Sequence, residues 1–232
     1  MKIELISVGS ELVSGHIRDL NAPLVAAKLT ELGVDVVNHT ITGDDSKDLK
    51  FSLKAGSERA DLIIITGGLG PTQDDITRET VADFCNLKLV SDKKSIDHVK
   101  SLVGNIHVQK YVNCLKQTEI PEGSTVIHNA TGTAQGFLVN FSQTNIICLP
   151  GVPSEMKQML EDWVIPYIVR ESEETKRRHT RVVNTFGMSE SLLDEKIQRI
   201  IKPDKSLSYS TLVNNGIVCI RTTLCNTDKI KA

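Results

Sequence analysis

A glycine-rich loop between an apolar run and an acidic segment most constrains how this chain can fold. Residues 61–80 read DLIIITGGLGPTQDDITRET. The apolar run at residues 62–65 is too short for a helix and too uniform for a half-exposed strand, so it predicts a strand buried on both faces of a parallel sheet. The glycines and the proline that follow predict a loop at the carboxyl end of this strand. We therefore expect an α/β fold organised around this strand and its loop.

The loop has the composition of a phosphate site. Gly67, Gly68 and Gly70 have no Cβ, so their backbone can approach a ligand closely. Asp74 and Asp75 follow where the next helix should begin, and either carboxylate could accept hydrogen bonds from free amides there. A helix N-terminus offers unpaired N–H donors and positive partial charge, which suit a phosphate.

The two aspartates also predict a cation. Two carboxylates beside a phosphate would repel it unless a hard ion such as Mg²⁺ lies between them, held by one or two carboxylates, phosphate oxygens and water. The alternative is that Asp74 or Asp75 caps the helix and the other is solvated. Spacing alone does not decide between these two interpretations.

Composition excludes several classes of protein. The chain has 232 residues and 40% hydrophobic content, enough for one large domain and a small appendage. A net charge of -2 and 4% aromatic residues provide neither the basic surface nor the stacking platform of a nucleic-acid binder. The five cysteines form no CxxC pair, which favours a reducing cytoplasm over disulfides or structural zinc. No signal peptide and no apolar run near the ~20 residues of a membrane span is present, so we expect a cytoplasmic protein without membrane or nucleic-acid partners.

Two further strand exits carry small and acidic residues. Residues 3–8 and 35–42 predict strands, and a helix capped by Asn21 is expected between them. Ligands of open α/β sheets bind at the carboxyl ends of strands, so we expect both exits to reach the same ligand. The residues that these exits contribute are Gly9, Ser10, Glu11 and Asp44.

Three short strands are expected at residues 125–127, 137–141 and 145–149. The last of them ends in LPGVPSEM, which opens a helix with apolar residues at i, i+3, i+4, i+7 and i+8. Ser154 is expected to cap this helix, and Glu155 could supply a third carboxylate to the metal or a base for water. A Pro and Ser cap followed by a Glu that favours the helix dipole explains the same pattern equally well.

The remaining segments are less specific. Residues 87–90 predict a short strand, and residues 92–103 and 108–115 predict helices of an insertion that covers one side of the site or makes a subunit contact. Charge-rich residues 171–179 predict a linker. Beyond it we expect a strand, a helix and a hairpin with Asn-Gly at its turn.

The segment TGGLGPTQDDITRE resembles the signature of the CinA family (competence/damage-inducible proteins), whose N-terminal domain is similar to molybdopterin-binding domains of the MoaB, MogA and gephyrin type. GSELVSGHIRDLNAPLVAAKL and PGVPSEM resemble two further blocks of that family in the same order. NATGTAQGF resembles the family's NxxGtApGf, with Gln135 where proline is usual, so this loop is expected to be less rigid.

The resemblance implies a three-layer α/β/α domain with a mostly parallel, MoaB/MogA-like sheet at residues 1–171. FGMSESLLDEKI resembles the opening helix of a KH-like domain, so residues 172–232 are expected to form a small, incomplete KH-like α+β domain, without the GxxG loop of RNA-binding KH modules. The resemblance also implies that the C-terminal nicotinamide-nucleotide amidase domain of many CinA proteins is missing.

The resemblance further implies an activity, the metal-dependent hydrolysis of a nucleotide pyrophosphate, with ADP-ribose as the substrate. Asp74, Asp75 and Glu155 would be catalytic, and Asp44, Asp74 and Asp75 would hold Mg²⁺, Mn²⁺ or Co²⁺, which lowers the pKa of a bound water. Whether potassium is also needed is left open. The residues expected to bind phosphate or nucleotide are Gly9, Ser10, Glu11, Asn21, Gly67, Gly68, Gly70, Thr77, Asn129, Gly132, Thr133, Gly151, Pro153 and Ser154.

Two alternatives remain. The first is a molybdopterin-binding or adenylyl-transferring protein of molybdenum-cofactor biosynthesis, which would use a similar glycine loop and aspartate to hold a pterin phosphate. The second is a non-catalytic nucleotide-binding module. By analogy with related domains, a homo-oligomer, either a dimer or a trimer, is expected.

Overall fold

The computed structural model describes residues 1–103, 115–172, 178–200, 207–214 and 216–225. The chain divides into two compact units, one formed by Met1–Ala27 and Asp35–Glu173 and the other by Lys28–Val34 and Glu174–Ala232. The helix expected at residues 108–115 lies outside the described residues apart from Leu115, and so does most of the expected linker at residues 171–179.

The first unit is built around a six-stranded sheet. Its strands are β1 (Lys2–Val8), β2 (Asp35–Thr42), β3 (Leu62–Thr66), β6 (Thr125–Ile127), β7 (Gly136–Phe141) and β8 (Thr144–Leu149). They are ordered β2-β1-β3-β8-β7-β6. The pairs β1–β2, β1–β3 and β3–β8 are parallel, whereas β7 and β6 are added antiparallel. The predicted mostly parallel sheet is confirmed.

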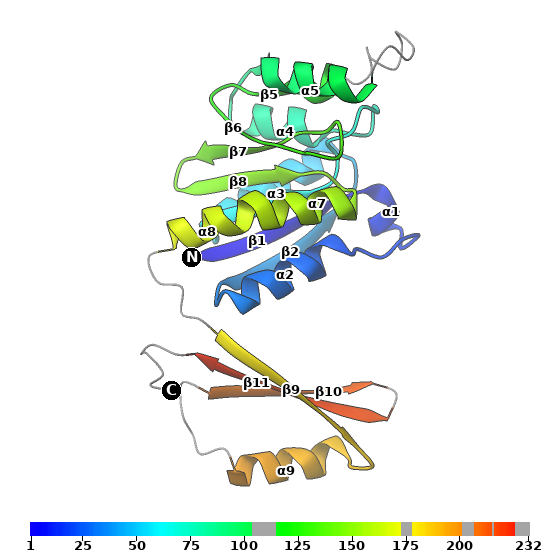
Figure 1. The fold of residues 1–232 in the computed structure, drawn as a ribbon, viewed down its shortest axis with the longest axis vertical. Coiled ribbons are helices and arrows are strands. Elements are labelled where there is room, and N and C mark those ends of the chain that lie inside the picture. Colours follow the sequence, from blue (N-terminus) through cyan, green and yellow to red (C-terminus); the bar gives the residue numbers. More distant parts are fainter. Residues whose placement is uncertain (104–114, 173–177, 201–206, 215, 226–232) are drawn as a thin grey trace. The chain divides into compact units, whose positions relative to one another are not determined.

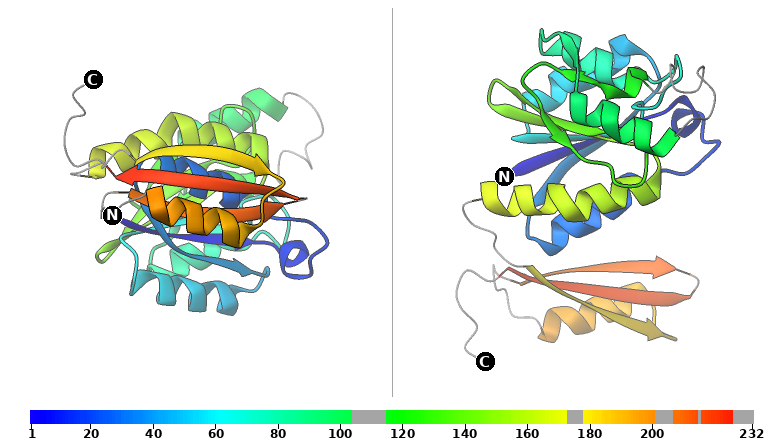
Figure 2. Two further views of the ribbon diagram at one scale, coloured as in Figure 1. Left: turned by 90° about the horizontal axis from the view of Figure 1, so that it is seen from below. Right: turned by 45° about the horizontal axis from the view of Figure 1, so that its top comes forward.

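Helices cover both faces of this sheet, as a three-layer fold requires (Figures 1 and 2). One face carries α2 (Asn21–Glu31), α7 (Pro153–Met159) and α8 (Ile165–Glu171), the last two joined by a π-helical turn at Leu160–Val164. The opposite face carries α3 (Ser46–Ser57) and α4 (Thr77–Phe84). The short α1 (Ser10–Val13) follows β1. A β4–β5 pair (Leu89–Ser91 and Glu119–Pro121), α5 (Lys93–Val103) and a 3-10 turn (Lys116–Thr118) form the insertion.

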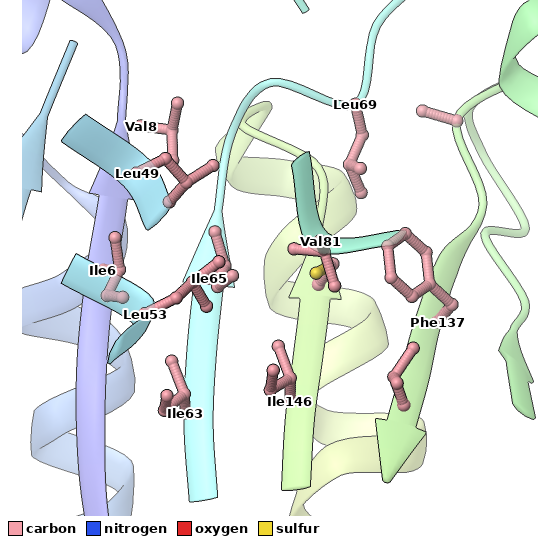
Figure 3. Close-up of a cluster of buried hydrophobic side chains, with 13 residues drawn as sticks. Ile6, Val8, Leu49, Leu53, Ile63, Ile65, Leu69, Val81, Phe137 and Ile146 are labelled. Carbon is pink, nitrogen blue, oxygen red and sulfur yellow. The ribbon is translucent and has the colours of Figure 1, made fainter. Parts of the chain in front are cut away.

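The core explains why the central strand is uniformly apolar. All five residues of β3 are buried, because helices pack on both of its faces. Figure 3 shows Leu49 and Leu53 of α3 and Val81 of α4 directed at the same side of the sheet as Ile63 and Ile65. The prediction of a fully buried strand at residues 62–65 is confirmed.

Strand register places three loops together. Ser7 of β1 pairs with Thr66 of β3, and Thr66 pairs with Leu149 of β8. Because these strands are parallel and end level with one another, the loops after them leave from one edge of the sheet. This edge is where the candidate site lies.

Helix starts differ from the sequence prediction at four places. Asp19 Oδ1, not Asn21, accepts the first amides of α2, from Asn21 N at 2.9 Å and Ala22 N at 3.1 Å. Asp45, not Ser46, caps α3. The helix expected near Asp74 begins only at Thr77. Ser154 does not cap α7, whose N-cap is Val152 with no side-chain hydrogen bond. At the starts of α2 and α3 an aspartate that precedes the expected cap, by two residues and by one residue, accepts two consecutive amides.

The second unit is a three-stranded antiparallel sheet with one helix. Strands β9 (Arg178–Phe186), β10 (Leu207–Asn214) and β11 (Ile217–Cys225) are ordered β10-β11-β9, and Leu193 and Ile197 of α9 (Glu190–Ile200) bury against Val218. The element order and the β10–β11 hairpin are as predicted, while the KH-like assignment stays a prediction. No helix in the described ranges combines the length and apolar character that a bilayer crossing needs.

Candidate functional site

A pocket of about 500 Å³ opens at the carboxyl edge of the parallel strands. Loops after β1, β2, β3 and β8 supply most of its wall, and the segment before β7 closes the remaining side. Its lining residues are Val8, Gly9, Glu11, Asp44, Gly67, Gly68, Leu69, Gly70, Pro71, Thr72, Asp74, Asp75, Gln117, Thr133, Ala134, Pro150, Gly151, Val152 and Glu155. Sequence segments more than a hundred residues apart thus meet around one cavity.

The glycine loop takes a course that only glycine allows at two positions. Gly67 has φ 103° and Gly68 has φ 67°. A Cβ at Gly67 would collide with the backbone oxygen of Val8, and one at Gly68 would collide with the Thr77 hydroxyl. Thr77 is fully buried and anchors the loop from within, since its Oγ1 donates to Gly67 O at 2.8 Å and its amide donates to Gly68 O at 3.1 Å.

Asp75 closes the loop on itself. Its Oδ1 accepts from Gly70 N at 2.8 Å, and its Oδ2 accepts from the amide and hydroxyl of Thr72 at 2.8 Å and 2.5 Å. The amides of Gly68 and Leu69 have no acceptor in the described part of the chain. Both residues line the pocket, so two backbone donors are available to an occupant.

Asp74 differs from its neighbour Asp75. It is exposed, lines the pocket and makes no hydrogen bond or ion pair with any residue that the structure describes. The two aspartates that the sequence presents as a pair therefore have separate environments. Asp75 holds the loop together, whereas the Asp74 carboxylate is free to interact with a bound ion or ligand.

A buried cation lies beneath the loop. Arg78 is fully buried and donates through Nη2 to Leu69 O at 2.9 Å. Burial lowers the pKa of its guanidinium from the usual value, but arginine stays charged in proteins. Its Nε and Nη1 have no partner among the described residues. Sequence reasoning missed this residue, because a charged side chain in the first turn of a helix normally indicates a solvated face.

Two hydrogen bonds join the loops that follow β1 and β2. Ser10 N donates to Asp44 Oδ2 at 2.9 Å, and Asp44 N donates to Ser10 Oγ at 3.1 Å. This reciprocal pair holds Asp44 at the pocket wall. Ser10 itself does not line the pocket.

Asn129 organises the loop on the opposite side of the pocket. Its Nδ2 donates to Ala134 O at 2.9 Å and to Glu155 Oε2 at 2.6 Å, while its Oδ1 accepts from Gly132 N at 2.9 Å. These bonds link the loop before β7 to the start of α7. Glu155, which lines the pocket, is therefore held by a buried amide.

Replacing Asn129 by alanine is expected to lower the free energy of unfolding by about 2–3 kcal/mol, because several buried hydrogen bonds lose their partner at once. Urea denaturation followed by circular dichroism measures this. The matched control is Asn140→Ala, at an exposed position of β7, which should cost little. Equal losses in the two variants would show that the Asn129 bonds contribute nothing specific.

The sequence-predicted residues fall into three groups. Those that line the pocket are Gly9, Glu11, Asp44, Gly67, Gly68, Gly70, Asp74, Asp75, Thr133, Gly151 and Glu155. Asn21 and Pro153 line an adjoining cavity of about 460 Å³, which shares Val8, Glu11, Gly67 and Gly151 with the first. Those that line neither are Ser10, Thr77, Asn129, Gly132 and Ser154; the first four pack against lining residues, and Ser154 is exposed.

Asn21 fixes the boundary between the two cavities. It is buried, and its Nδ2 donates to Gly151 O at 2.8 Å across the site. Its predicted role as a helix cap is therefore replaced by a role in holding the loop after β8. The apolar walls of the adjoining cavity, Leu12, Ile17 and Leu20, were not predicted, since apolar residues in a loop carry no recognisable motif.

Gln117 is a further lining residue that the sequence did not reveal. It is buried, accepts from Thr133 Oγ1 at 2.8 Å and approaches Leu69 O with its Nε2 at 3.4 Å. It lies at the end of the insertion, where no local pattern indicates a site. The insertion thus covers one side of the pocket, which is one of the two roles expected for it.

The pocket is acidic. Its lining includes the carboxylates of Glu11, Asp44, Asp74, Asp75 and Glu155, and no lysine or arginine among the described residues. Nevertheless, the described ranges hold no group of three or more His, Cys, Asp or Glu side chains arranged to bind a metal. The divalent-cation prediction stays a prediction.

Comparisons with known proteins find a family model and relatives that match most of the chain. Residues 4–170 match the model of a family described as the probable molybdopterin binding domain. A putative competence-damage inducible protein of Acetivibrio thermocellus is 40% identical over 223 residues, covering 96% of this chain and 54% of the relative. One of Shouchella clausii is 37% identical over 233 residues, covering 100% of this chain and 56% of the relative. The chain spans about half the length of these curated relatives.

A solved structure is also similar. The CinA protein of Thermoplasma acidophilum, described as having unknown function, is 30% identical, with a TM-score of 0.66, and the match covers 71% of this chain and 96% of that chain. The likeness therefore includes nearly all of the archaeal protein. It supports the predicted α/β fold with a mostly parallel sheet.

The predicted ADP-ribose pyrophosphatase activity is wrong. The matching family is described by molybdopterin binding, and the relatives reported above are competence-damage inducible proteins, not nucleotide pyrophosphatases. The alternative, a molybdopterin-binding protein, fits these findings better than a hydrolase does. Because the family model matches residues 4–170, and the CinA protein of Thermoplasma acidophilum is 30% identical with 96% of its chain covered, the chain belongs to the CinA family, with a probable molybdopterin binding domain at residues 4–170.

Proposed function

We propose that the pocket binds a phosphorylated pterin of the molybdopterin class, with its phosphate at the glycine loop and its ring in the adjoining cavity. The observation that carries this proposal is the pair of unpaired amides at Gly68 and Leu69, in a loop that Asp75 holds closed. The family description of residues 4–170 supports the pterin as the ligand class.

The phosphate end is supported by backbone donors and by charge. Amides that converge on one point of a glycine loop form an anion-binding concavity. The buried guanidinium of Arg78, bonded to Leu69 O, adds a positive charge beneath that loop. Its field is weakly screened, because water is excluded from its surroundings.

The ring end is supported by the adjoining cavity. Val8, Leu12 and Leu20 give it apolar walls suited to the faces of a bicyclic heterocycle, and its volume is within the range of small-molecule sites. Glu11 lines both cavities, so its carboxylate could accept hydrogen bonds from the ring N–H groups of a pterin. Asp19 also lines this cavity, but both of its carboxylate oxygens already accept hydrogen bonds within the chain, so specificity for the ring would come from Glu11.

A divalent cation such as Mg²⁺, Mn²⁺ or Co²⁺ completes the proposal. The five carboxylates of the pocket would repel a phosphate, and a cation between them would remove that repulsion. Asp74 is free to hold it, whereas Asp75 and Asp44 already accept backbone amides. Because no three-ligand group is preformed in the described ranges, the ion would depend on the ligand's phosphate oxygens for the rest of its coordination.

Fluorescence anisotropy of a phosphorylated pterin titrated with the full chain tests this function. We expect saturable binding that weakens at least about tenfold, or about 1.4 kcal/mol, when the phosphate is removed from the pterin. Isothermal titration calorimetry with AMP is the nucleotide arm of this test. Binding of AMP with no binding of the pterin would overturn the proposal in favour of a nucleotide site.

The cation has its own expected result. Without ligand, isothermal titration with Mg²⁺ or Mn²⁺ should show no tight site, whereas addition of the same ion should strengthen binding of the phosphorylated pterin. Asp74→Asn should abolish that strengthening, while Asp83→Asn, an exposed aspartate of α4 outside the pocket, should not. Tight metal binding by the ligand-free chain would contradict a ligand-dependent ion.

A further inference from the structure

A second cavity lies in the first unit, outside the site described above. It has a volume of about 860 Å³ and shares no lining residue with the glycine-loop pocket or its adjoining cavity. One wall is Asp92 and the first residues of α5, and the other is formed by Val126, His128 and Gln135. Its volume is within the range of small-molecule sites.

The N-terminus of α5 concentrates positive charge on this cavity. Asp92 caps the helix, since its Oδ2 accepts from the amide and the hydroxyl of Ser95 at 2.7 Å and 2.8 Å. The amides of Lys93 and Lys94, which lie between Asp92 and Ser95, have no intrahelical acceptor. The side chains of both lysines are exposed and form no ion pair with the described residues. Two ammonium groups at the positive end of a helix dipole oppose that dipole, and a bound anion would offset the conflict.

Gln135 supplies an independent observation that points to a ligand. It is only 1% exposed, lines the cavity and is oriented by its Oε1, which accepts from Asn129 N at 2.9 Å. Its Nε2 is left without a partner among the described residues. A buried N–H donor without an acceptor costs about 1–3 kcal/mol, which an oxygen of a ligand would recover.

The other titratable groups leave the balance of charge positive. Asp92 is the acidic residue of the lining, and its Oδ2 is already engaged twice by Ser95. His128 contacts His98 edge to face with ring centroids 4.7 Å apart, and His98 Nε2 donates to Gly132 O at 3.0 Å. The two lysines thus share the cavity with the imidazole of His128 and with one carboxylate that already accepts two hydrogen bonds.

The geometry points to a second anion-binding site, at the N-terminus of α5, for the phosphate group of a small phosphorylated molecule. The phosphate would accept from the amides of Lys93 and Lys94 and pair with their ammonium groups. An oxygen of the same ligand would accept from Gln135 Nε2. This site does not depend on the function proposed for the glycine loop.

Heteronuclear NMR of the full chain, titrated with inorganic phosphate at constant ionic strength, tests the site. We expect saturable shifts of the Lys93 and Lys94 backbone amides and of the Gln135 side-chain amide, with chloride producing none. The double variant Lys93→Gln/Lys94→Gln should weaken this binding at least about tenfold. The matched control, Lys47→Gln/Lys54→Gln on α3, removes the same charge from another capped helix and should leave it unchanged.

Gln135→Glu distinguishes a site that includes the Gln135 side chain from anion binding by the N-terminus of α5 alone. Glutamate keeps the oxygen that accepts from Asn129 N but replaces the donor Nε2 with an acceptor, so phosphate binding should be lost. The buried carboxylate should also lower the melting temperature, so binding is measured well below the melting temperature of the variant. Lysine-amide shifts that persist unchanged in this variant would overturn the proposal, as would shifts that chloride reproduces. Loss of binding at the glycine loop leaves this site unaffected, so the two proposals fail independently.

Discussion

Replacement of Gly67 by alanine is expected to lower the free energy of unfolding by at least about 2 kcal/mol and to abolish ligand binding at the glycine loop. Gly67 has φ 103°, a conformation that strains any residue with a Cβ. That Cβ would also collide with the backbone oxygen of Val8, which belongs to a core strand and cannot move aside. Urea denaturation measures the stability, and pterin fluorescence anisotropy measures the binding.

Gly123→Ala is the matched control for this prediction. Gly123 also has a positive φ, 78°, but a Cβ there would have open space around it. Its loss should be about 1 kcal/mol, from backbone strain alone, with ligand binding unchanged. Equal losses at the two positions would show that the approach of Gly67 to Val8 is not what restricts that residue to glycine.

Asp75→Ala is expected to weaken binding of a phosphorylated pterin at least about 30-fold in EDTA, equivalent to about 2 kcal/mol. The substitution frees the Gly70 amide and both donors of Thr72, so the loop loses the bonds that hold the Gly68 and Leu69 amides in place. The loss should be in affinity more than in stability, because the freed donors lie at the surface of the pocket and can bind water.

Asp74→Ala is the matched control in the same buffer. It removes the same charge from the same pocket but no hydrogen bond within the described chain. Without a divalent ion, affinity for the phosphorylated ligand should therefore stay the same or rise, since a repulsive carboxylate is gone. A loss in Asp74→Ala that equals the loss in Asp75→Ala would contradict the distinct roles assigned to the two aspartates.

The sequence predicts the parallel sheet and its exits well because the relevant signals are local. The run at residues 62–65 is apolar on both faces, and β3 is indeed covered by helices on both sides. The exits of β1, β2 and β8 were found for the same reason, since each strand ends in glycine, proline or acidic residues. Parallel pairing then brings these exits to one edge without further information.

The contacts that set each residue's role could not be predicted, because they join distant segments. Arg78 and Gln117 both lie against Leu69 O, and neither belongs to a recognisable motif. Asp74 and Asp75 are adjacent in sequence, yet Asp75 turns inward to the loop amides. The activity was mispredicted because it was taken from a family resemblance, whereas a glycine loop with carboxylates is compatible with hydrolysis and with binding, and a fold does not decide between them.

A crystal structure of the full chain with a phosphorylated pterin tests the central claim most directly. We expect the phosphate within hydrogen-bond distance of the Gly68 and Leu69 amides, and the ring between Val8, Leu20 and Glu11 in the adjoining cavity. A pterin bound anywhere else, including the cavity at α5, with the glycine loop free of phosphate at saturating ligand, would contradict it.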